Sequence, residues 1–550
     1  MRSAYFDRLA SWLVLSVFCA VLALVFFLPI YTDEIAIKLV APRMLRDHFV
    51  WFSLYPQCGV SFSSHLPWTL VPGGVINWFI NGSMTQPIFI RIIGVLTFVA
   101  WLAMLTWFMQ QKLQGNASLL SIMAGLVSFI SLGIMPFLMV LNRSEQPILI
   151  GLTLICLSPY IAAKYQPSTN KTWIVFVAGF FLVTSYMLSI HPKPLLFIPV
   201  MLAAVYYLAV TSRRVWVGVL LSGWLAVSAY QSYKFWTSNL NCSDAPFLNA
   251  DFKSQSLSLG LLLSAPSEFL MSGLRELKHS YVYIKNALFE LRYSPNWLPP
   301  SHDQTLGWFS SINDVAISLI YFSTLCYSIF ALTKRVRHGF DSGKFLHETT
   351  MPLALFVGMF LCGFFLAGKF FYESALMLPL LLLLVLMLLP KAPLAREGNR
   401  AQQYIFKLLL VASIASQINL ILTFAPYPLG TWLAGGQVDG QRFSISSFNY
   451  NKIRGDIIRT AENCGITVDN AGAHLVIDNS TYFPFKDTYM PFHLDSILGR
   501  DVGDGNLMQF LKVRNSAGLI TRCDSLSPEI RKLTKQNGNY CCIGKQDINK

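Results

Sequence analysis

The chain has 550 residues, of which 54% are hydrophobic and only 13% are charged, and its formal net charge is +14. This composition excludes an ordinary soluble multidomain protein and favours one large polytopic membrane region with a smaller soluble part. The positive charge does not indicate a nucleic-acid partner, because much of the Lys and Arg lies in short loops between apolar segments. Zinc-finger spacings, Walker loops and glycine-rich dinucleotide motifs are absent from the sequence.

Apolar segments long enough to approach a membrane span, which takes about 20 residues, recur along the chain. The first follows Arg2 and Arg8 and is too long for a signal peptide, so we expect a retained helix. We predict about eleven spans, of which 147–163 and 215–230 are short, at 9–30, 88–109, 118–141, 147–163, 173–190, 194–211, 215–230, 315–332, 351–371, 374–390 and 405–424.

The positive-inside rule gives an orientation for these spans. With the N-terminus inside, the inner loops carry most of the basic residues, namely Lys112, Lys164, Lys171, Arg213, Arg214, Lys334, Arg335, Arg337, Lys344, Lys391, Arg396 and Arg400. The outer face then receives the loops 31–87 and 231–314, three short turns and the chain after about residue 425. Within the second loop, residues 268–293 have the mixed apolar and basic pattern of a helix in the head-group layer.

The C-terminal part, 430–550, is more polar than the rest of the chain. Strand-like runs at 473–477 and 519–521 alternate with helix-like stretches at 451–462 and 529–536, which predicts a small extracytoplasmic α/β or α+β domain. Residues 1–429 would form the membrane domain. An outer location permits disulfides, whose pairing stays open, although adjacent cysteines bond poorly to each other; the candidates are Cys464, Cys523, Cys541 and Cys542.

Candidate site residues gather on the predicted outer face. The pair Asp33–Glu34 directly follows the first span, and each of the turns 142–147, 191–194 and 369–373 holds a basic residue, against the charge bias of the loops. Charged groups at membrane depth are costly and commonly mark a site. Arg and Lys bind phosphate, and an Asp beside a hydroxyl can act as a general base. These residue types suit a lipid-phosphate substrate.

This layout resembles the GT-C superfamily of integral-membrane glycosyltransferases. The matching residues are Tyr31-Thr32-Asp33-Glu34 and the polar turns around Arg143-Ser144-Glu145, His191-Pro192-Lys193 and Lys369 to Glu373. The resemblance implies a polyprenyl-phosphate sugar donor, inversion at the anomeric carbon, a glycan, lipid or protein acceptor, and usually no metal. It implies Asp33 as the base, with Glu34 supporting it or exchanging roles with it; Glu34 alternatively pairs with Lys38.

The other candidate residues are assigned by their chemistry. Donor phosphate would be bound by Lys193, Lys369 and Arg143, and substrate by Glu145, His191, Tyr372, Glu373 and Arg43. His191 is alternatively a structural cap, and Arg43 is alternatively a solvated residue. We expect no cofactor and no metal site, because His48 and His65 lie too far apart in sequence to form a metal motif.

The sequence therefore predicts a lipid-linked-sugar glycosyltransferase of the bacterial inner membrane, acting on the outer face, with cell-surface polysaccharide or lipopolysaccharide as acceptor. Two other functional hypotheses stay open. One is a transporter or flippase for a lipid-linked or anionic substrate, which predicts charged or broken helices at mid-membrane. The other is an O-antigen polymerase or ligase, which uses related donors and arginine-rich outer loops.

Overall fold

The structure is a computed structural model of the whole chain. It describes residues 2–35, 51–52, 63–64, 66–82, 84, 86–113, 117–165, 169–239, 250, 254–289, 307–342, 349–389, 400–433, 445, 450–467, 474–485, 490–493, 507–513 and 515–548. Arg43 and Lys38 lie outside these residues. Asp33 is placed only as part of a helix, and its side chain is not described.

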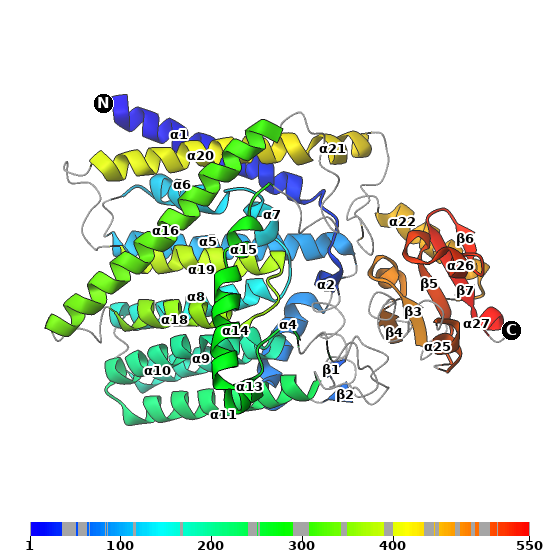
Figure 1. Cartoon of the computed structure of the whole chain (residues 1–550), viewed down its shortest axis with the longest axis horizontal. Coiled ribbons are helices and arrows are strands. Elements are labelled where there is room, and N and C mark those ends of the chain that lie inside the picture. Colours follow the sequence, from blue (N-terminus) through cyan, green and yellow to red (C-terminus); the bar gives the residue numbers. More distant parts are fainter. Residues whose placement is uncertain are drawn as a thin grey trace.

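A bundle of long apolar helices confirms the predicted polytopic membrane protein (Figure 1). Among the described residues, nine helical segments are long and apolar enough to span a membrane. Both segments that are short in the sequence belong to them, within Glu145–Tyr165 and Val215–Thr237. The helices that contain these spans are α1 (Arg2–Val25), α5 (Pro87–Lys112), α8 (Glu145–Tyr165), α9 (Asn170–Ile190), η3 (Lys193–Phe197) with α10 (Ile198–Ser212), α11 (Val215–Asn239), α16 (Gly307–Ser342), η5 (Phe371–Glu373) with α19 (Ser374–Leu388), and α20 (Arg400–Phe424).

The predicted span 118–141 is wrong as one continuous helix. It is divided into α6 (Leu119–Ile130) and α7 (Met135–Met139), with Gly133 between them at a φ of 62°. A Cβ at Gly133 would lie 1.7 Å from the carbonyl oxygen of Ala287, so only glycine fits here. The amides freed by the break find new partners, as a membrane interior requires: Gly133 N donates to Ser416 Oγ, and Ile134 N donates to the Ala287 carbonyl.

The predicted span 351–371 is also shorter than expected. Helix α18 (Thr350–Phe365) ends at Phe365, and the chain continues in an extended form to Lys369. Leu366 forms a β-bridge with Ser256, and Ala367 N donates to the carbonyl of Gln255 at 3.0 Å. The long loop after α11 thus supplies the hydrogen bonds that end this helix, and it places Lys369 beside that loop.

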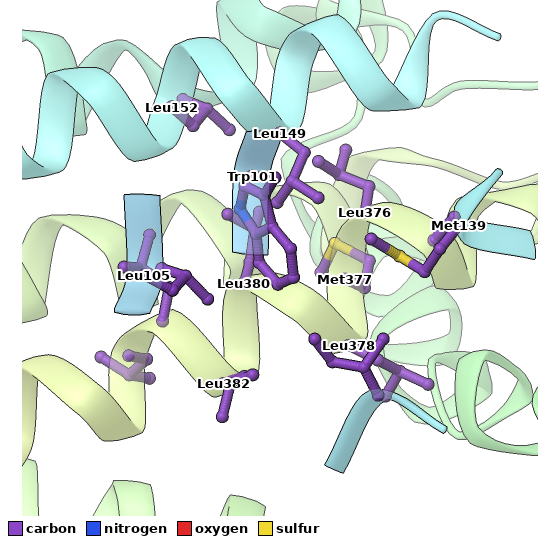
Figure 2. Packing of buried hydrophobic residues seen from close by; sticks show 14 of the residues in the cluster. Trp101, Leu105, Met139, Leu149, Leu152, Leu376, Met377, Leu378, Leu380 and Leu382 are labelled. Atoms are coloured by element: carbon purple, nitrogen blue, oxygen red, sulfur yellow. The ribbon is translucent and has the colours of Figure 1, made fainter. Parts of the chain in front are cut away.

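The centre of the bundle is packed by α5, α7, α8 and α19. Figure 2 shows Trp101 and Leu105 from α5 against Leu149 and Leu152 from α8, with leucines of α19 beside them. The indole nitrogen of Trp101 donates to Thr153 Oγ1 at 3.0 Å, so this polar atom is satisfied inside the apolar core. Helix α19 is the most buried of the spans, and it packs on α8, α16 and α18.

The two ends of the bundle differ in their charged residues. At the end where α19 stops, Lys112 Nζ donates to the carbonyls of Leu386 and Met387, and Arg335 donates to the carbonyls of Leu388 and Leu389. Two cations therefore satisfy the free carbonyls at the negative end of this helix. Both belong to the predicted inner loops, and the predicted outer turns lie at the start of α19 instead.

Shorter elements cover the end of the bundle where α19 starts. The first loop contains α2 (Thr32–Ile35), the two-stranded β1 (Trp51–Phe52) with β2 (Ser63–Ser64), and α4 (Val71–Asn81), which sequence analysis did not predict. The second loop forms α13 (Leu259–Ser264), α14 (Pro266–His279) and α15 (Val282–Lys285). Helix α14 runs across the spans and packs on α18, as an interfacial helix would (Figure 1).

The C-terminal part forms a mixed five-stranded sheet in the order β4-β3-β5-β7-β6. Strands β4 and β5 pair parallel to β3, whereas β7 pairs antiparallel to β5 and β6. This confirms the predicted α/β character. The elements are α21 (Pro426–Leu433), α22 (Tyr450–Asn463), β3 (His474–Ile477), η6 (Asn479–Thr481), α23 (Tyr482–Phe485), β4 (Met490–His493), α25 (Leu507–Val513), β5 (Gly518–Arg522), η8 (Cys523–Ser525), α26 (Pro528–Arg531), β6 (Lys535–Asn537), β7 (Tyr540–Gly544) and α27 (Lys545–Ile548).

The helix predicted at 529–536 is too long. Only Pro528–Arg531 is helical, and Lys535–Asn537 pairs with β7 as an edge strand, so tertiary pairing overrides local propensity. Disulfides join Cys464 to Cys542 and Cys523 to Cys541. Successive side chains of a strand point to opposite faces, which explains why neighbouring Cys541 and Cys542 bond to different partners.

The C-terminal sheet region docks on the first loop. Ile30 and Ile445 form a β-bridge, in which Ile30 N donates to the Ile445 carbonyl at 2.8 Å. Ile30 and Ile35 share one buried apolar cluster with Tyr482 and other residues of the sheet region. Figure 1 shows α2 between the bundle and this region. The soluble part therefore sits directly over the segment that carries Asp33 and Glu34.

Candidate functional site

The three predicted outer turns meet in one buried cluster of charged side chains. Lys193 Nζ, from the start of η3, lies 2.8 Å from Glu145 Oε1 at the start of α8 and 2.8 Å from Glu373 Oε1 at the end of η5. Arg143 Nε lies 3.5 Å from Glu145 Oε2. All four side chains are buried. Two cations and two carboxylates therefore share one desolvated place and balance each other's charge. We call these four residues the charge cluster.

Aromatic rings line the charge cluster. The guanidinium carbon of Arg143 lies 3.2 Å from the ring centre of Tyr372 and 5.4 Å from that of Tyr31. Lys193 Nζ is 5.2 Å from the same Tyr372 ring. Tyr31 also packs edge-on against Phe371, with ring centres 5.6 Å apart. Cation–π contacts of this kind stabilise buried cations. Through Tyr31, they also bring the first loop against the charge cluster.

Glu34 is fully buried and has a different set of partners. Its Oε1 accepts from Arg91 Nη1 at 3.3 Å and from the backbone N of Asn142 at 2.7 Å. Its Oε2 accepts from Arg91 Nη2 at 3.3 Å and from Tyr31 N at 2.8 Å. These four bonds use the acceptor positions that a carboxylate offers. Glu34 thus ties the first loop to α5 and to the turn that carries Arg143.

This contact network extends into α4. Asn142 Nδ2 donates to Asn81 Oδ1 at 3.0 Å, and Asn81 Nδ2 donates to Asn77 Oδ1 at 2.7 Å. All three side chains are buried. Arg91, Asn77 and Asn81 were not among the site residues predicted from the sequence. A signal was present for each, because a charged residue inside a predicted span and amides in an apolar stretch are unusual.

Lys369 lies beside the charge cluster but not within it. Its Nζ donates to the carbonyls of Gly363, at 3.0 Å, and Leu366, and is 3.7 Å from Glu276 Oε2. Its Nζ is also 6.0 Å from the ring centre of Tyr283. Burial lowers the pKa of Lys369, and the carboxylates of Glu276 and Glu373 only partly oppose this shift. The positive charge of Lys369 is thus incompletely compensated, so an anion beside it would be favourable.

His191 adopts the arrangement of the structural-cap alternative. Its Nδ1 accepts a hydrogen bond from Lys193 N at 3.1 Å, and its ring centre lies 6.2 Å from that of Trp236. Burial lowers the pKa of His191 to about 3, and the charge of nearby Lys193 acts in the same direction. The ring is therefore neutral near pH 7, with Nδ1 free of a proton and able to accept.

The depressed pKa of His191 predicts a pH-dependent contribution to stability. Between about pH 6.5 and about pH 3 the unfolded chain binds a proton that the folded chain excludes, so stability falls as pH decreases through this window. We expect His191→Gln to lose less stability than the wild type between about pH 7 and about pH 5. Melting temperatures at both pH values would measure this, and equal losses in both proteins would contradict it.

Among the described residues, no group of three or more His, Cys, Asp or Glu side chains is arranged to hold a metal ion. The charge cluster instead supplies cations next to buried carboxylates and aromatic rings. Such a set can bind an anionic head group and orient neutral hydroxyl groups.

Comparisons with known proteins give weak likeness only. No protein-family model matches the chain, and no curated protein matches it in sequence. Among solved structures, the archaeal oligosaccharyltransferase AglB from Archaeoglobus fulgidus, in complex with an inhibitory peptide and a dolichol-phosphate, is 11% identical over 93% of this chain and 69% of its own, with a TM-score of 0.38. The apo form of the Archaeoglobus fulgidus oligosaccharyltransferase is 11% identical over 93% of this chain and 70% of its own, with a TM-score of 0.40. At such values, the function of this chain has to be inferred from its own side chains.

Proposed function

We propose that this chain is an inverting glycosyltransferase that moves a sugar from a polyprenyl-phosphate donor to a glycan or lipid acceptor at the outer face of a bacterial inner membrane. One observation carries the proposal: three turns from distant parts of the chain bring Arg143, Lys193 and Lys369 to one end of an apolar bundle, beside the loop with Asp33. Buried cations at the end of membrane spans suit a lipid phosphate.

The proposed phosphate ligands differ in how far nearby carboxylates compensate their charge. Lys193 is bonded to two carboxylates, so its charge is already compensated, and its proposed role is to hold Glu145 and Glu373 in place. Lys369 has one carboxylate at 3.7 Å, so its charge is less compensated than that of Lys193. A phosphate would therefore gain more electrostatic energy beside Lys369 than beside Lys193. Arg143, adjacent to Tyr31 and Tyr372, would be the second phosphate ligand. Tyr372 and Glu145 would contact the substrate from this side.

In the proposed reaction, the acceptor hydroxyl oxygen attacks the anomeric carbon from the face opposite the phosphate. The bond between this carbon and the phosphate oxygen breaks, and polyprenyl phosphate leaves with the electron pair, stabilised by Lys369 and Arg143. Asp33 takes the acceptor proton as general base. Glu34, whose acceptor positions are used by Arg91 and two backbone amides, positions the loop rather than moving a proton.

Asp33→Asn tests the proposal directly. With purified full-length protein, a labelled polyprenyl-phosphate sugar and a lipopolysaccharide acceptor, we expect transfer to fall by at least about 100-fold, because a general base contributes about 10² to 10⁴. The matched control is Asp524→Asn, which alters an exposed carboxylate of the C-terminal region and should transfer sugar at the wild-type rate.

Two outcomes would overturn this proposal in different ways. Full transfer by Asp33→Asn would remove Asp33 as the base. A wild-type protein that transfers no label, yet moves the lipid-linked sugar across proteoliposomes, would establish the transporter alternative instead.

A further inference from the structure

Two short segments that pack against each other concentrate buried polar atoms without hydrogen-bond partners among the described residues. Helix α15 packs on η5 and on the start of α19. The atoms are Tyr283 Oη and both amide atoms of Asn286 from the first segment, and Glu373 Oε2 and Ser374 Oγ from the second. Tyr283 is 4% exposed, Asn286 4%, Glu373 3% and Ser374 0%. Each such atom costs about 1–3 kcal/mol if it stays unbonded, so this concentration marks a place where a ligand would complete the bonds.

These atoms adjoin the charge cluster and Lys369. Glu373 belongs to the charge cluster, in which its other oxygen, Oε1, lies 2.8 Å from Lys193 Nζ. Tyr283 has Lys369 Nζ 6.0 Å from its ring centre. Burial raises the pKa of Tyr283, and the negative charge of the Glu373 carboxylate that the phenol faces acts in the same direction, so the phenol keeps its proton. The hydroxyl group of Tyr283, a hydrogen-bond donor, therefore faces the carboxylate of Glu373, a hydrogen-bond acceptor. Both lie near Lys369, the cation proposed to bind the phosphate.

A hydroxyl group is the ligand that matches this pair. It accepts one hydrogen bond and donates another, so one hydroxyl can accept from Tyr283 Oη and donate to Glu373 Oε2. The amide of Asn286 also offers both a donor and an acceptor, which suits a neighbouring hydroxyl of the same ring. Asn286 lies three residues after Tyr283, on the same side of the helical turn. A sugar attached to a phosphate carries such hydroxyl groups close to the phosphate.

We propose that Tyr283, Asn286, Glu373 and Ser374 bind the hydroxyl groups of the donor sugar while Lys369 binds its phosphate. This proposal rests on the proposed glycosyltransferase function and adds the residues that select the sugar. Of these four residues, only Glu373 was predicted from the sequence, as a substrate-binding residue. The proposal assigns Glu373 to the sugar of the donor lipid.

The test compares Tyr283→Phe with Tyr281→Phe in the full-length protein. Tyr281 is exposed and lies just before the same helix, so it is a matched control. The donors are polyprenyl-phosphate glucose, galactose and mannose, and the single-deoxy analogues of the best of them. We expect Tyr283→Phe to raise KM for the best donor about tenfold, and to reduce the preference for the intact donor over one deoxy analogue from about 10–100-fold to under about threefold.

Binding without turnover gives a second readout. In the wild type, the sugar-bearing lipid should raise the melting temperature more than polyprenyl phosphate alone. In Tyr283→Phe and in the near-isosteric Asn286→Leu, that extra rise should disappear. The free Asn286→Leu protein should melt at the wild-type temperature or above it, since it loses a buried amide that has no side-chain partner among the described residues. This combination of unchanged or higher stability with weaker sugar binding is not expected from residues with a purely structural role.

The failure of this inference is distinguishable from failure of the proposed function. If the wild type transfers sugar and Tyr283→Phe keeps both its KM and its donor preference, the sugar subsite is wrong and the glycosyltransferase stands. If polyprenyl phosphate and all three sugar-bearing lipids raise the wild-type melting temperature equally, the subsite is also wrong. If the wild type transfers no sugar from any donor, the proposed function fails, and this inference fails with it.

Discussion

Replacing Lys193 by Met is expected to destabilise the folded protein by about 3–5 kcal/mol, because two buried carboxylates would lose the cation between them. Lys193 Nζ is 2.8 Å from both Glu145 and Glu373, and all three side chains are almost completely buried. Methionine nearly preserves the volume, so the loss would come from charge rather than from packing. Denaturant unfolding of the purified protein in detergent would measure the change.

The double variant Lys193→Met with Glu373→Gln separates charge from shape. It leaves only Glu145, which keeps Arg143 as a partner at 3.5 Å, so we expect it to recover part of the lost stability. Lys452→Met, on the exposed surface of α22, is the control for loss of a lysine and should change stability by less than about 0.5 kcal/mol. A single variant Lys193→Met within about 1 kcal/mol of the wild type would show that the three groups do not form a buried charge network.

Arg91→Met is expected to have a similar effect on stability and a larger one on the proposed reaction. Arg91 donates to both oxygens of Glu34 and to the carbonyls of Pro29 and Val140, and both members of the Arg91–Glu34 ion pair are fully buried. Its loss would leave the Glu34 carboxylate without a cation, at about 3–5 kcal/mol. It would also release the first loop from the turn before Arg143. Because Asp33 adjoins Glu34, we expect sugar transfer to fall even where the protein stays folded.

Glu34→Gln tests the Arg91–Glu34 ion pair from the side of the carboxylate. It keeps the shape of the side chain and removes the charge, so Arg91 becomes the unpaired group and stability should again fall. If the Arg91→Met protein remains folded at low temperature and transfers sugar at the wild-type rate, Glu34 does not position Asp33. Arg459→Met, whose side chain is 66% exposed in the C-terminal region, is the matched control.

The charge balance has a consequence for the proposed donor site. In the charge cluster, Arg143 and Lys193 are matched by Glu145 and Glu373, and outside it Lys369 faces Glu276. A phosphate that enters this place competes with carboxylates already present. Its binding should therefore be strongest where compensation is weakest, which is at Lys369. This explains why the geometry favours Lys369 over Lys193 as a phosphate ligand, although sequence analysis treated the two alike.

The helices were largely predictable and their interruptions were not. Hydrophobic length alone locates each apolar segment, because a helix that satisfies its own backbone is the simplest way to cross a lipid bilayer. The break at Gly133 depends on the Ala287 carbonyl and on Ser416, which lie far away in sequence. The end of α18 depends in the same way on the loop at Gln255. Neither partner is visible in a local pattern.

The residues of the candidate site were also only partly predictable from the sequence. Basic residues in predicted outer turns pointed to Arg143, Lys193 and Lys369, because such residues break the charge bias of membrane loops. Tyr283 and Asn286 were missed, since a tyrosine or an asparagine near a helix end is unremarkable without its neighbours. Arg91 was missed although a charged residue inside a predicted span is unusual. The catalytic assignment of Asp33 remains a prediction, and Arg43 lies outside the described residues.

By itself, the sequence determined that the chain is a polytopic helical membrane protein with a polar C-terminal region, and which turns carry charge. These properties follow from hydrophobic length and from the cost of placing charge in lipid, and both act locally along the chain. Only the tertiary structure decided that Lys193 joins two carboxylates, that Glu34 faces Arg91, and which cysteines are paired. Those contacts join residues tens to hundreds of positions apart, and which of many possible partners meet depends on how the whole bundle packs.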